Sequence, residues 1–455
     1  MRSLWAVAKN TIAQAVRMKT AVIFIILLVV LLPVMSVAMP GDGTLKGRLQ
    51  TFVSYGLGLT NLLLCLLTII VSTYTLSSDI KERRVYTVLT KPIRRIEYLF
   101  GKFLGVVLLD VFLLVVFCGV IYVLAVSTPA VSGAGEEEIK RVNNEFFTAR
   151  ALLTPPTVDV SEEVREKYEQ LKQQGQLPAK LSPARALAEL TRQKELEKRA
   201  AAPGRELIWE FYGVQPFEPN DRIFVRFKYD VSVNPPDLNV YGRWLVGDYR
   251  QYQFGAGDME TPIYVIDRKD LIRTFHEIVV QADAVASDGY LAVVFQNIPV
   301  NDTVVIFPLE EGLEVLYKAR SFTLNFILAG LVIAARLIFL AAFGISVCTW
   351  LSFPVAMLTC LVIYFTGSMS GFIFESLGFS TSGFGHVYSV VLTPVIKLLP
   401  QFDRFNPTDK MVYARLLDWS FLGYVFGVMV CIKAVILWFL GVVIFMYREV
   451  AKVTV

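Results

Sequence analysis

The sequence predicts an α-helical membrane protein with six transmembrane helices and one inserted extracytoplasmic domain. That domain is predicted to be α+β and to end in an antiparallel β-sandwich or jelly-roll. Of the 455 residues, 55% are hydrophobic and only 18% are charged, which is too apolar for an average soluble protein. Six apolar runs each have about the length of one bilayer crossing, which needs about 20 residues. A single long polar segment interrupts these runs.

The N-terminal residues 1–19 carry Arg2, Lys9, Arg17 and Lys19 and no acid. Apolar residues recur among them at helical spacing, which predicts an amphipathic helix in the membrane interface that leads into the first span. The alternative is a signal peptide cleaved after residues 36–38. The long charged segment and the span-length run that follows it favour the first interpretation.

The six predicted spans lie near residues 21–39, 52–77, 103–127, 321–346, 353–376 and 419–446. The fourth and fifth runs are nearly continuous, and we separate them at Trp350, Ser352 and Pro354 because together they have about twice the length of one crossing. The chain is therefore predicted to have an N-terminal membrane half, 1–127, and a C-terminal membrane half, 321–455, embedded in the lipid bilayer.

Basic residues predict the orientation. An even number of spans places both termini on the same side. The short segments 1–20, 78–102 and 447–455 hold thirteen Lys and Arg residues, whereas 40–50 and 377–418 hold six. Because short basic loops stay in the cytoplasm, the sequence predicts a multi-pass protein of a cell membrane with both termini cytoplasmic.

The loop between the second and third spans is the most basic of these segments. Its sequence also reads as a helix over 78–95, which Ser78 would cap, Asp79 and Glu82 would stabilise at the positive end, and Pro92 would end. Apolar residues at Ile80, Val85, Val88 and Leu89 give it a partial apolar face. One interpretation is a docking helix for a cytoplasmic partner, and the other is a charged loop that only sets topology.

This loop resembles that of the integral-membrane permeases of type-2 ATP-binding-cassette transporters, whose pattern is S-x-E-I-E-x-x-T-x-x-x-L-L-x-K-P-I-x-R followed by G-K-x-x-G. The matching residues are Ser77, Ile80, Leu89, Lys91, Pro92, Ile93, Arg95, Gly101, Lys102 and Gly105, with Asp79 and Val88 as near matches. The chain departs from the pattern at Lys81 and Arg84. The resemblance covers about 1–127 and 321–455, and the family also begins with an elbow helix.

In that family this loop forms the coupling helix, which fits a groove on the ATPase subunit. The resemblance therefore implies docking through Asp79, Glu82, Arg83, Lys91 and Arg95. It also implies a homodimer, or a heterodimer with a similar permease, in a bacterial cytoplasmic membrane.

No phosphate-binding loop of the form G-x-x-x-x-G-K-[ST] occurs in the chain, so we expect a separate cytoplasmic ATPase subunit to bind ATP. All five cysteines lie in apolar runs, and the two histidines, His276 and His386, are far apart in sequence. We therefore expect no catalytic residues, no metal site, no cofactor bound by this chain and no nucleic-acid partner.

Three charged residues, Asp110, Arg336 and Lys433, fall within the predicted spans. A charge that faces lipid costs at least about 2.5 kcal/mol, so each should face protein, water or a membrane surface. They would line a transport path or form a conformational latch, with Asp110 paired to Arg336 or Lys433. The alternative is snorkelling or a purely structural ion pair.

The polar segment 128–320 is predicted to be extracytoplasmic, helical over 136–201 and β-rich over 205–318. Apolar residues alternate with polar ones from Ile223 to Val233, which is typical of a half-buried strand. Further strands are expected near 239–246, 262–266, 274–281, 289–296, 302–307 and 312–318. Several short strands at this spacing favour a sandwich or jelly-roll.

Four aromatic residues of this segment, Tyr241, Trp244, Tyr249 and Tyr252, are a candidate platform for stacking a sugar or a lipid headgroup. The alternative is that they belong to the core or rim of the sheets, because a fold does not by itself reveal a ligand.

Together these features favour the permease subunit of an exporter that is driven by a separate ATPase. The alternative is a transmission or scaffold protein, which would use ATP hydrolysis to move its outer domain against an envelope partner without transport. A third interpretation is a membrane-anchored binding or sensor protein that has no ATPase.

Overall fold

The structure is a computed structural model that describes residues 2–39, 41–84, 93–156, 159–174, 183–218, 221–251, 261–309, 311–373 and 399–447. The chain divides into two compact units. The helical unit comprises 1–149 together with 321–455, and the β unit comprises 150–320.

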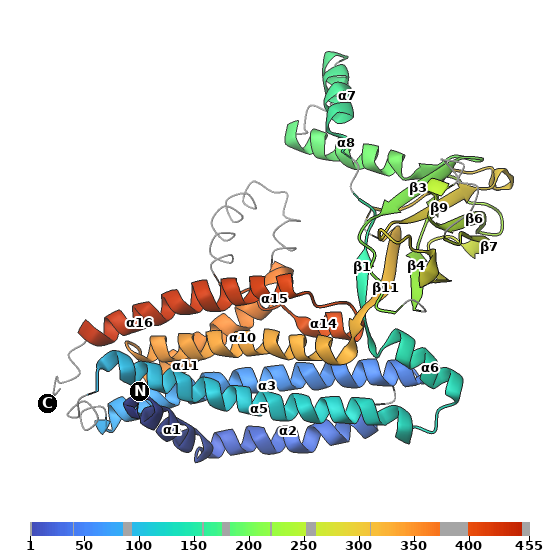
Figure 1. Ribbon diagram of the computed structural model, residues 1–455. Helices are drawn as coiled ribbons and strands as arrows, with labels where there is room; N and C mark the ends of the chain where they lie inside the picture. The colour runs from blue at the N-terminus through green and yellow to red at the C-terminus, as the bar shows by residue number, and fades with distance from the viewer. Residues whose placement is uncertain are drawn as a thin grey trace. The chain divides into compact units, whose positions relative to one another are not determined.

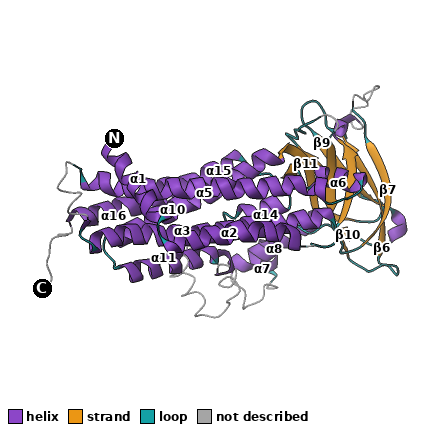
Figure 2. Ribbon diagram, turned by 90° about the horizontal axis from the view of Figure 1, so that it is seen from below, coloured by secondary structure: helices purple, strands orange, loops and turns teal. Residues whose placement is uncertain are grey.

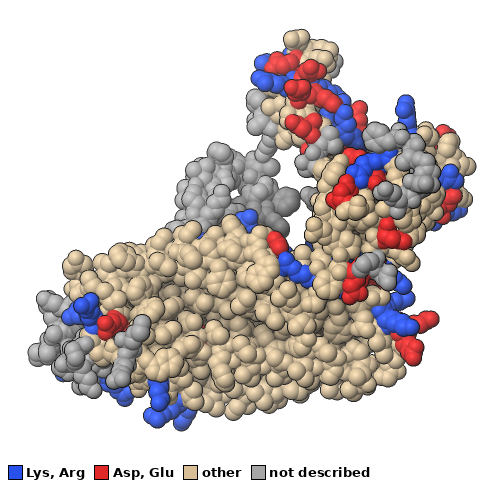
Figure 3. Space-filling view, viewed as in Figure 1, with Lys and Arg blue, Asp and Glu red and all other residues tan. Residues whose placement is uncertain are grey.

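The helical unit contains five described helices that are long and apolar enough to cross a membrane. They are α2 (Lys19–Ala38), α3 (Leu45–Lys81), α5 (Arg95–Val131), α10 (Phe322–Cys348) and a continuous helix made of α15 (Trp419–Val425), the π-helical η3 (Phe426–Ala434) and α16 (Val435–Tyr447). The face of this unit drawn in Figure 3 carries almost no charged side chains along its middle. The helices indicate a multi-pass membrane protein.

The predicted fifth span corresponds to α11 (Phe353–Ser368), an apolar helix of 16 residues that is shorter than the other five. The predicted break before it is confirmed, since α10 ends at Cys348 and α11 begins at Phe353 with Pro354 in its first turn, where proline costs no helical hydrogen bond. Much of the segment 377–418, which includes His386, lies outside the described residues. Its described part, 399–418, contains the short helix α14 (Pro407–Val412).

The centre of the helical unit is α10, which packs against α3, α5, η3 and α16. Figure 1 shows α10, α3, α5 and α2 running side by side. The predicted N-terminal amphipathic helix is present as α1 (Arg2–Val16), which lies along α5 and leaves Trp5 exposed.

Several helix termini lie together at one end of the helical unit, and we call it the α3 end because α3 finishes there. There the Ser3 hydroxyl lies 3.4 Å from a Glu97 carboxylate oxygen, Arg95 donates to the Met446 carbonyl at 2.9 Å, and the Cys348 thiol lies 3.4 Å from the Thr73 carbonyl. The starts of α1 and α5 and the ends of α3, α10 and α16 therefore meet at the α3 end.

The predicted helix over 78–95 needs correction in its described part. Ser78 does not begin a new helix, because α3 continues through it to Lys81. The amide of Glu82 donates to the Ser78 carbonyl at 2.8 Å, and Arg83 then adopts a left-handed φ of 58° that ends the helix, as residues at this position often do. Residues 85–92 lie outside the described residues.

The boundary between the units also differs from the prediction of residue 128. Helix α5 extends to Val131, and α6 (Glu136–Glu145) packs on α3, where Glu145 pairs with Lys46 and Glu138 accepts from the Leu45 amide at 2.7 Å. The β unit begins at Arg150 because these contacts keep α6 in the helical unit.

The β unit is built from short strands, which Figure 2 shows gathered in one place. They are β1 (Thr148–Leu153), β2 (Ala200–Ala201), β3 (Glu206–Phe211), β4 (Arg222–Phe227), β5 (Asp230–Val231), β6 (Asn239–Gly247), β7 (Tyr264–Leu271), β8 (His276–Gln281), β9 (Leu291–Asn297), β10 (Val305–Ile306) and β11 (Leu313–Ser321). The sheets have the orders β1-β11-β4-β8, β2-β10-β5 and β3-β9-β6-β7. Between β1 and β2 stand helices α7 (Ser161–Gln173) and α8 (Pro183–Lys198), which pack on each other.

The two four-stranded sheets share an aromatic core. The rings of Phe227 on β4 and Trp244 on β6 lie 4.2 Å apart, and Trp244 also contacts Phe295 on β9 at 4.9 Å and Phe307 at 5.9 Å. Alternate residues of each strand point into this core. Adjacent strands are antiparallel in register, with Trp244 opposite Phe295 and Ile266.

Candidate functional site

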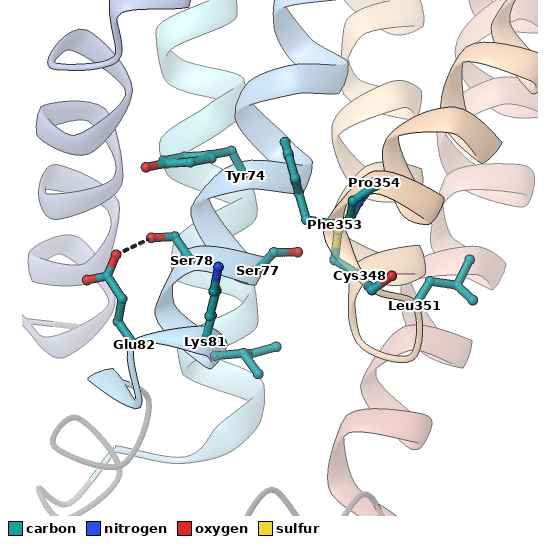
Figure 4. Close-up of a pocket in the computed structure, with 11 residues that line it drawn as sticks. Tyr74, Ser77, Ser78, Lys81, Glu82, Cys348, Leu351, Phe353 and Pro354 are labelled. Atoms are coloured by element: carbon teal, nitrogen blue, oxygen red, sulfur yellow. Dashed lines mark hydrogen bonds between the residues drawn. The ribbon is translucent and has the colours of Figure 1, made fainter.

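A pocket of about 590 Å³ opens at the α3 end, between the last turns of α3 and the turn that joins α10 to α11 (Figure 4). Apolar side chains form most of its lining, and hydroxyl groups, Lys81 and Glu82 add polar atoms. The lining residues are Tyr74, Ser77, Ser78, Ile80, Lys81, Glu82, Cys348, Leu351, Ser352, Phe353 and Pro354. The pocket is therefore lined by the start of the basic loop and by the turn between α10 and α11.

Two of the predicted docking residues lie on the surface beside this pocket. Glu82 and Arg83 are exposed just past the end of α3. Glu82 accepts a hydrogen bond from the Ser78 hydroxyl at 2.9 Å and pairs with Arg84. Exposed ion pairs of this kind contribute little to stability, so these side chains can exchange partners at small cost.

Arg95 and Lys91 have different positions. Arg95 begins α5, and its guanidinium donates to the carbonyls of Phe445 at 3.2 Å and Met446 at 2.9 Å. It thus binds the C-terminal end of α16, where a cation is favourable. Lys91 lies outside the described residues.

Asp79, the remaining predicted docking residue, does not lie on the surface. It is 4% exposed, and its carboxylate lies 2.6 Å from the ammonium of Lys102 and accepts from the Tyr98 hydroxyl at 2.6 Å. Lys102 is fully buried and also donates to Gln14 at 3.1 Å and to the Thr75 carbonyl at 3.2 Å. We call these side chains, Asp79, Lys102, Tyr98 and Gln14, the Asp79 cluster.

The Asp79 cluster joins three helices, since Gln14 belongs to α1, Asp79 to α3, and Tyr98 and Lys102 to α5. Removing two charges from water costs several kcal/mol for each ion, which mutual attraction offsets only when further hydrogen bonds are made. The Tyr98 hydroxyl and the Thr75 carbonyl supply such bonds. The cluster is therefore stable as a set, and the loss of one charge would leave the other buried and unpaired.

Two glycines allow α1 to approach α5 beside this cluster. A Cβ atom on Gly105 would lie 2.7 Å from the Ala8 carbonyl oxygen and 2.7 Å from the Thr11 Cβ, and one on Gly101 would lie 2.8 Å from the Val7 Cβ. Small residues permit this closeness between membrane helices. The G-K-x-x-G motif thus has a structural reason: its glycines admit α1, and its lysine reaches Asp79.

The three intramembrane charges each have a separate partner. Asp110 accepts from the Thr68 hydroxyl at 3.0 Å, Arg336 donates to the Phe402 carbonyl at 2.6 Å, and Lys433 donates to the Leu399 carbonyl at 2.6 Å. All three are described, and no ion pair joins Asp110 to Arg336 or Lys433. These contacts fit the structural interpretation better than a shared latch.

The four predicted platform aromatics do not form one surface. Trp244 is 0% exposed in the core of the β unit, whereas Tyr241 is 40% exposed with the Lys269 ammonium 4.8 Å from its ring. Positions three apart on a strand face opposite sides, which separates these two side chains. Tyr249 donates to Glu206 at 3.3 Å and is half-buried, and Tyr252 lies outside the described residues.

Sequence reasoning missed another aromatic group in the β unit. The Arg250 guanidinium stacks 3.9 Å from the Tyr290 ring and binds Asp248 at 2.8 Å and Asp288 at 2.7 Å. Its hydrogen bonds hold the pKa of Asp288 below the usual value, and burial raises the pKa of Tyr290. Because these groups bind one another, they stabilise the turn after β6 and do not form an open site.

No group of three or more His, Cys, Asp or Glu side chains in the described part of the chain could hold a metal ion. In comparisons with known proteins, no protein-family model, curated protein or solved structure matches the chain.

Proposed function

We propose that this chain is the permease subunit of an ATP-binding-cassette exporter, which moves a substrate across a bacterial cytoplasmic membrane. A separate cytoplasmic ATPase would bind ATP and dock at the α3 end. The main support is the arrangement there. An exposed charged turn at Glu82, Arg83 and Arg84 lies beside an open pocket. The same turn follows Asp79, which belongs to the buried cluster that joins α1, α3 and α5.

We propose six spans: the five long helices and, as the fifth in chain order, α11. Helices α10 and α16 both end at the α3 end, whereas the Leu417 amide, just before α15, donates to Asn325 near the start of α10 at 2.7 Å. The described residues Cys348 and Leu417, which bound this part of the chain, therefore lie at opposite ends of the helical unit. At 1.5 Å per residue, α11 covers about 24 Å of a hydrocarbon core of about 30 Å. This topology supports two cytoplasmic termini.

The β unit would then lie outside the cytoplasm, because the chain leaves α5 for it and re-enters α10 at the end opposite the α3 end. Two four-stranded antiparallel sheets around an aromatic core support a sandwich of the jelly-roll kind. Two copies, or one copy and a similar permease, would pair in the membrane. Closure of two ATPases would push both α3 ends and reorient the helices.

The second candidate is a transmission protein, which moves its outer domain against an envelope partner without passing a substrate. One observation favours it: Asp110, Arg336 and Lys433 are each bound by a hydroxyl or a backbone carbonyl of the helical unit. Charges that are bound in this way do not require a polar path. Both candidates use the same docked ATPase, so docking is tested first.

We expect the full-length chain, purified from its native membrane, to bring a nucleotide-hydrolysing subunit with it. Replacing Arg83 and Arg84 together with glutamate should lower the recovery of that subunit by about tenfold, equivalent to about 1.4 kcal/mol. The physical reason is that two positive charges of the exposed turn become negative, which weakens its attraction to an acidic partner surface.

The matched control is Arg141→Glu, which reverses an exposed charge on α6 at the opposite end of the helical unit. Its recovery should equal that of the wild type. Docking at the α3 end is wrong if both variants recover the subunit equally. The proposed function as a whole is wrong if the wild type never brings an ATPase with it.

A further inference from the structure

We propose that the buried Asp79–Lys102 ion pair is the positioning contact through which motion of the α3 end reaches α5 and α1. This inference depends on the proposed function, since the docked ATPase supplies the motion. The inference assigns a role to Asp79 and Lys102, two buried residues that are not part of the docking surface.

The path is short and made of direct contacts. The exposed turn begins at Glu82, three residues after Asp79 and within one helical turn of it. Asp79 binds Lys102 and Tyr98 of α5 at 2.6 Å each. A displacement of the last turn of α3 therefore pulls directly on α5 through these two contacts.

Helix α1 must follow α5 because the two lie in backbone contact. The Cβ positions of Gly101 and Gly105 are filled by Val7, Ala8 and Thr11, and Lys102 donates to Gln14 between them. Interfaces packed this closely shift between discrete arrangements and do not deform continuously. Helix α1 would thus move together with the start of α5.

The ion pair suits this role better than an apolar contact would. Its members are 0% and 4% exposed, so water cannot replace either partner and the pair cannot separate without leaving two buried charges. An apolar contact would let α3 slide along α5. The pair fixes the register of the two helices, a use that is well attested for buried polar groups.

The test removes both charges at once. The double variant Asp79→Asn with Lys102→Met leaves no unpaired ion, so it should fold and still recover the ATPase. Hydrogen exchange is then measured in α1 and in the first three turns of α5, with and without a non-hydrolysable ATP analogue. The nucleotide-dependent change in exchange should fall by about fivefold or more, the lower end of typical coupling between sites.

A purely structural role predicts the opposite, because a double variant that folds would then respond like the wild type. An undiminished response in a variant that still binds the ATPase overturns this inference and leaves the proposed function standing. Failure of the wild type to bind any ATPase overturns both.

If the double variant does not fold, Tyr98→Phe is measured in its place. It removes one hydrogen bond to Asp79 and keeps both charges, and the response should fall by about twofold to tenfold, the range for one hydrogen bond. Asp79→Glu, which keeps the carboxylate, should respond more strongly than Tyr98→Phe. An unchanged response in Tyr98→Phe overturns the inference.

Discussion

Replacing Trp244 with alanine is expected to destabilise the β unit by about 3–5 kcal/mol, the usual cost of truncating a large aromatic residue in a core. Trp244 is fully buried and contacts Phe227, Phe295 and Phe307, which come from both four-stranded sheets and from the turn after β10. Its loss would leave a cavity where the sheets meet, and the surrounding rings could fill that cavity only in part.

The measurement is limited proteolysis of the full-length protein in detergent over a denaturant series, followed through fragments of 150–320. The expected loss raises the opened fraction of the β unit by roughly 10²–10⁴-fold, at about 1.4 kcal/mol for each tenfold change. Tyr241→Ala is the matched control, since Tyr241 lies on the same strand but faces outward. It should cost less than about 1 kcal/mol. Equal effects would contradict the position of Trp244 in a shared core.

Much of the β unit could be predicted because its strands alternate visibly between apolar and polar residues. The predicted strands near 239–246 and 289–296 correspond to β6 and β9 within two residues. Strand β3 was missed although Leu207, Trp209 and Phe211 carry the same alternation, so a signal was present there. Strand β1 has no such signal. Its residues follow a charged helical segment, and they form a strand because they pair with the distant strand β11.

The long prediction from Ile223 to Val233 shows a different limit. Alternation continues through it, but β4 ends at Phe227 and pairing resumes only at Asp230 in β5, which belongs to another sheet. The alternation of apolar and polar residues shows which side chains face the core. It does not show where the chain leaves one sheet and pairs with a strand of another. Tyr229 keeps its inward position through the break, because its ring stacks on Phe227 at 5.7 Å.

The site was predictable in place and not in detail. The basic residues and the G-K-x-x-G motif indicated the loop and the helix junction at which the pocket and the Asp79 cluster lie. The sequence suggested Asp79 as an exposed acid at the start of a helix, but α3 continues through it because Lys102 neutralises it from another helix. No local pattern announces a pair 23 positions apart on two helices. For the same reason the contact of Arg95 with the end of α16 could not be seen.

Replacing Gly105 with valine is expected to separate α1 from α5 and to cost about 3 kcal/mol, the upper end of the usual penalty for overpacking. The new Cβ would lie 2.7 Å from the Ala8 carbonyl oxygen, a backbone atom that cannot turn aside as a side chain would. Relief requires α1 to move as a whole. That movement would also lengthen the contact between Gln14 and Lys102.

Gly119→Val is the matched control on the same helix, since nothing lies within 4 Å of its Cβ position. The change should alter stability by less than about 0.5 kcal/mol, and valine's better helix propensity favours a small gain. Thermal unfolding in detergent compares the two variants, and hydrogen exchange over α1 reports the separation directly. If Gly105→Val left α1 as protected as Gly119→Val does, then α1 would not be in backbone contact with α5. The register that joins α1, α3 and α5 would then depend on the Asp79 cluster alone.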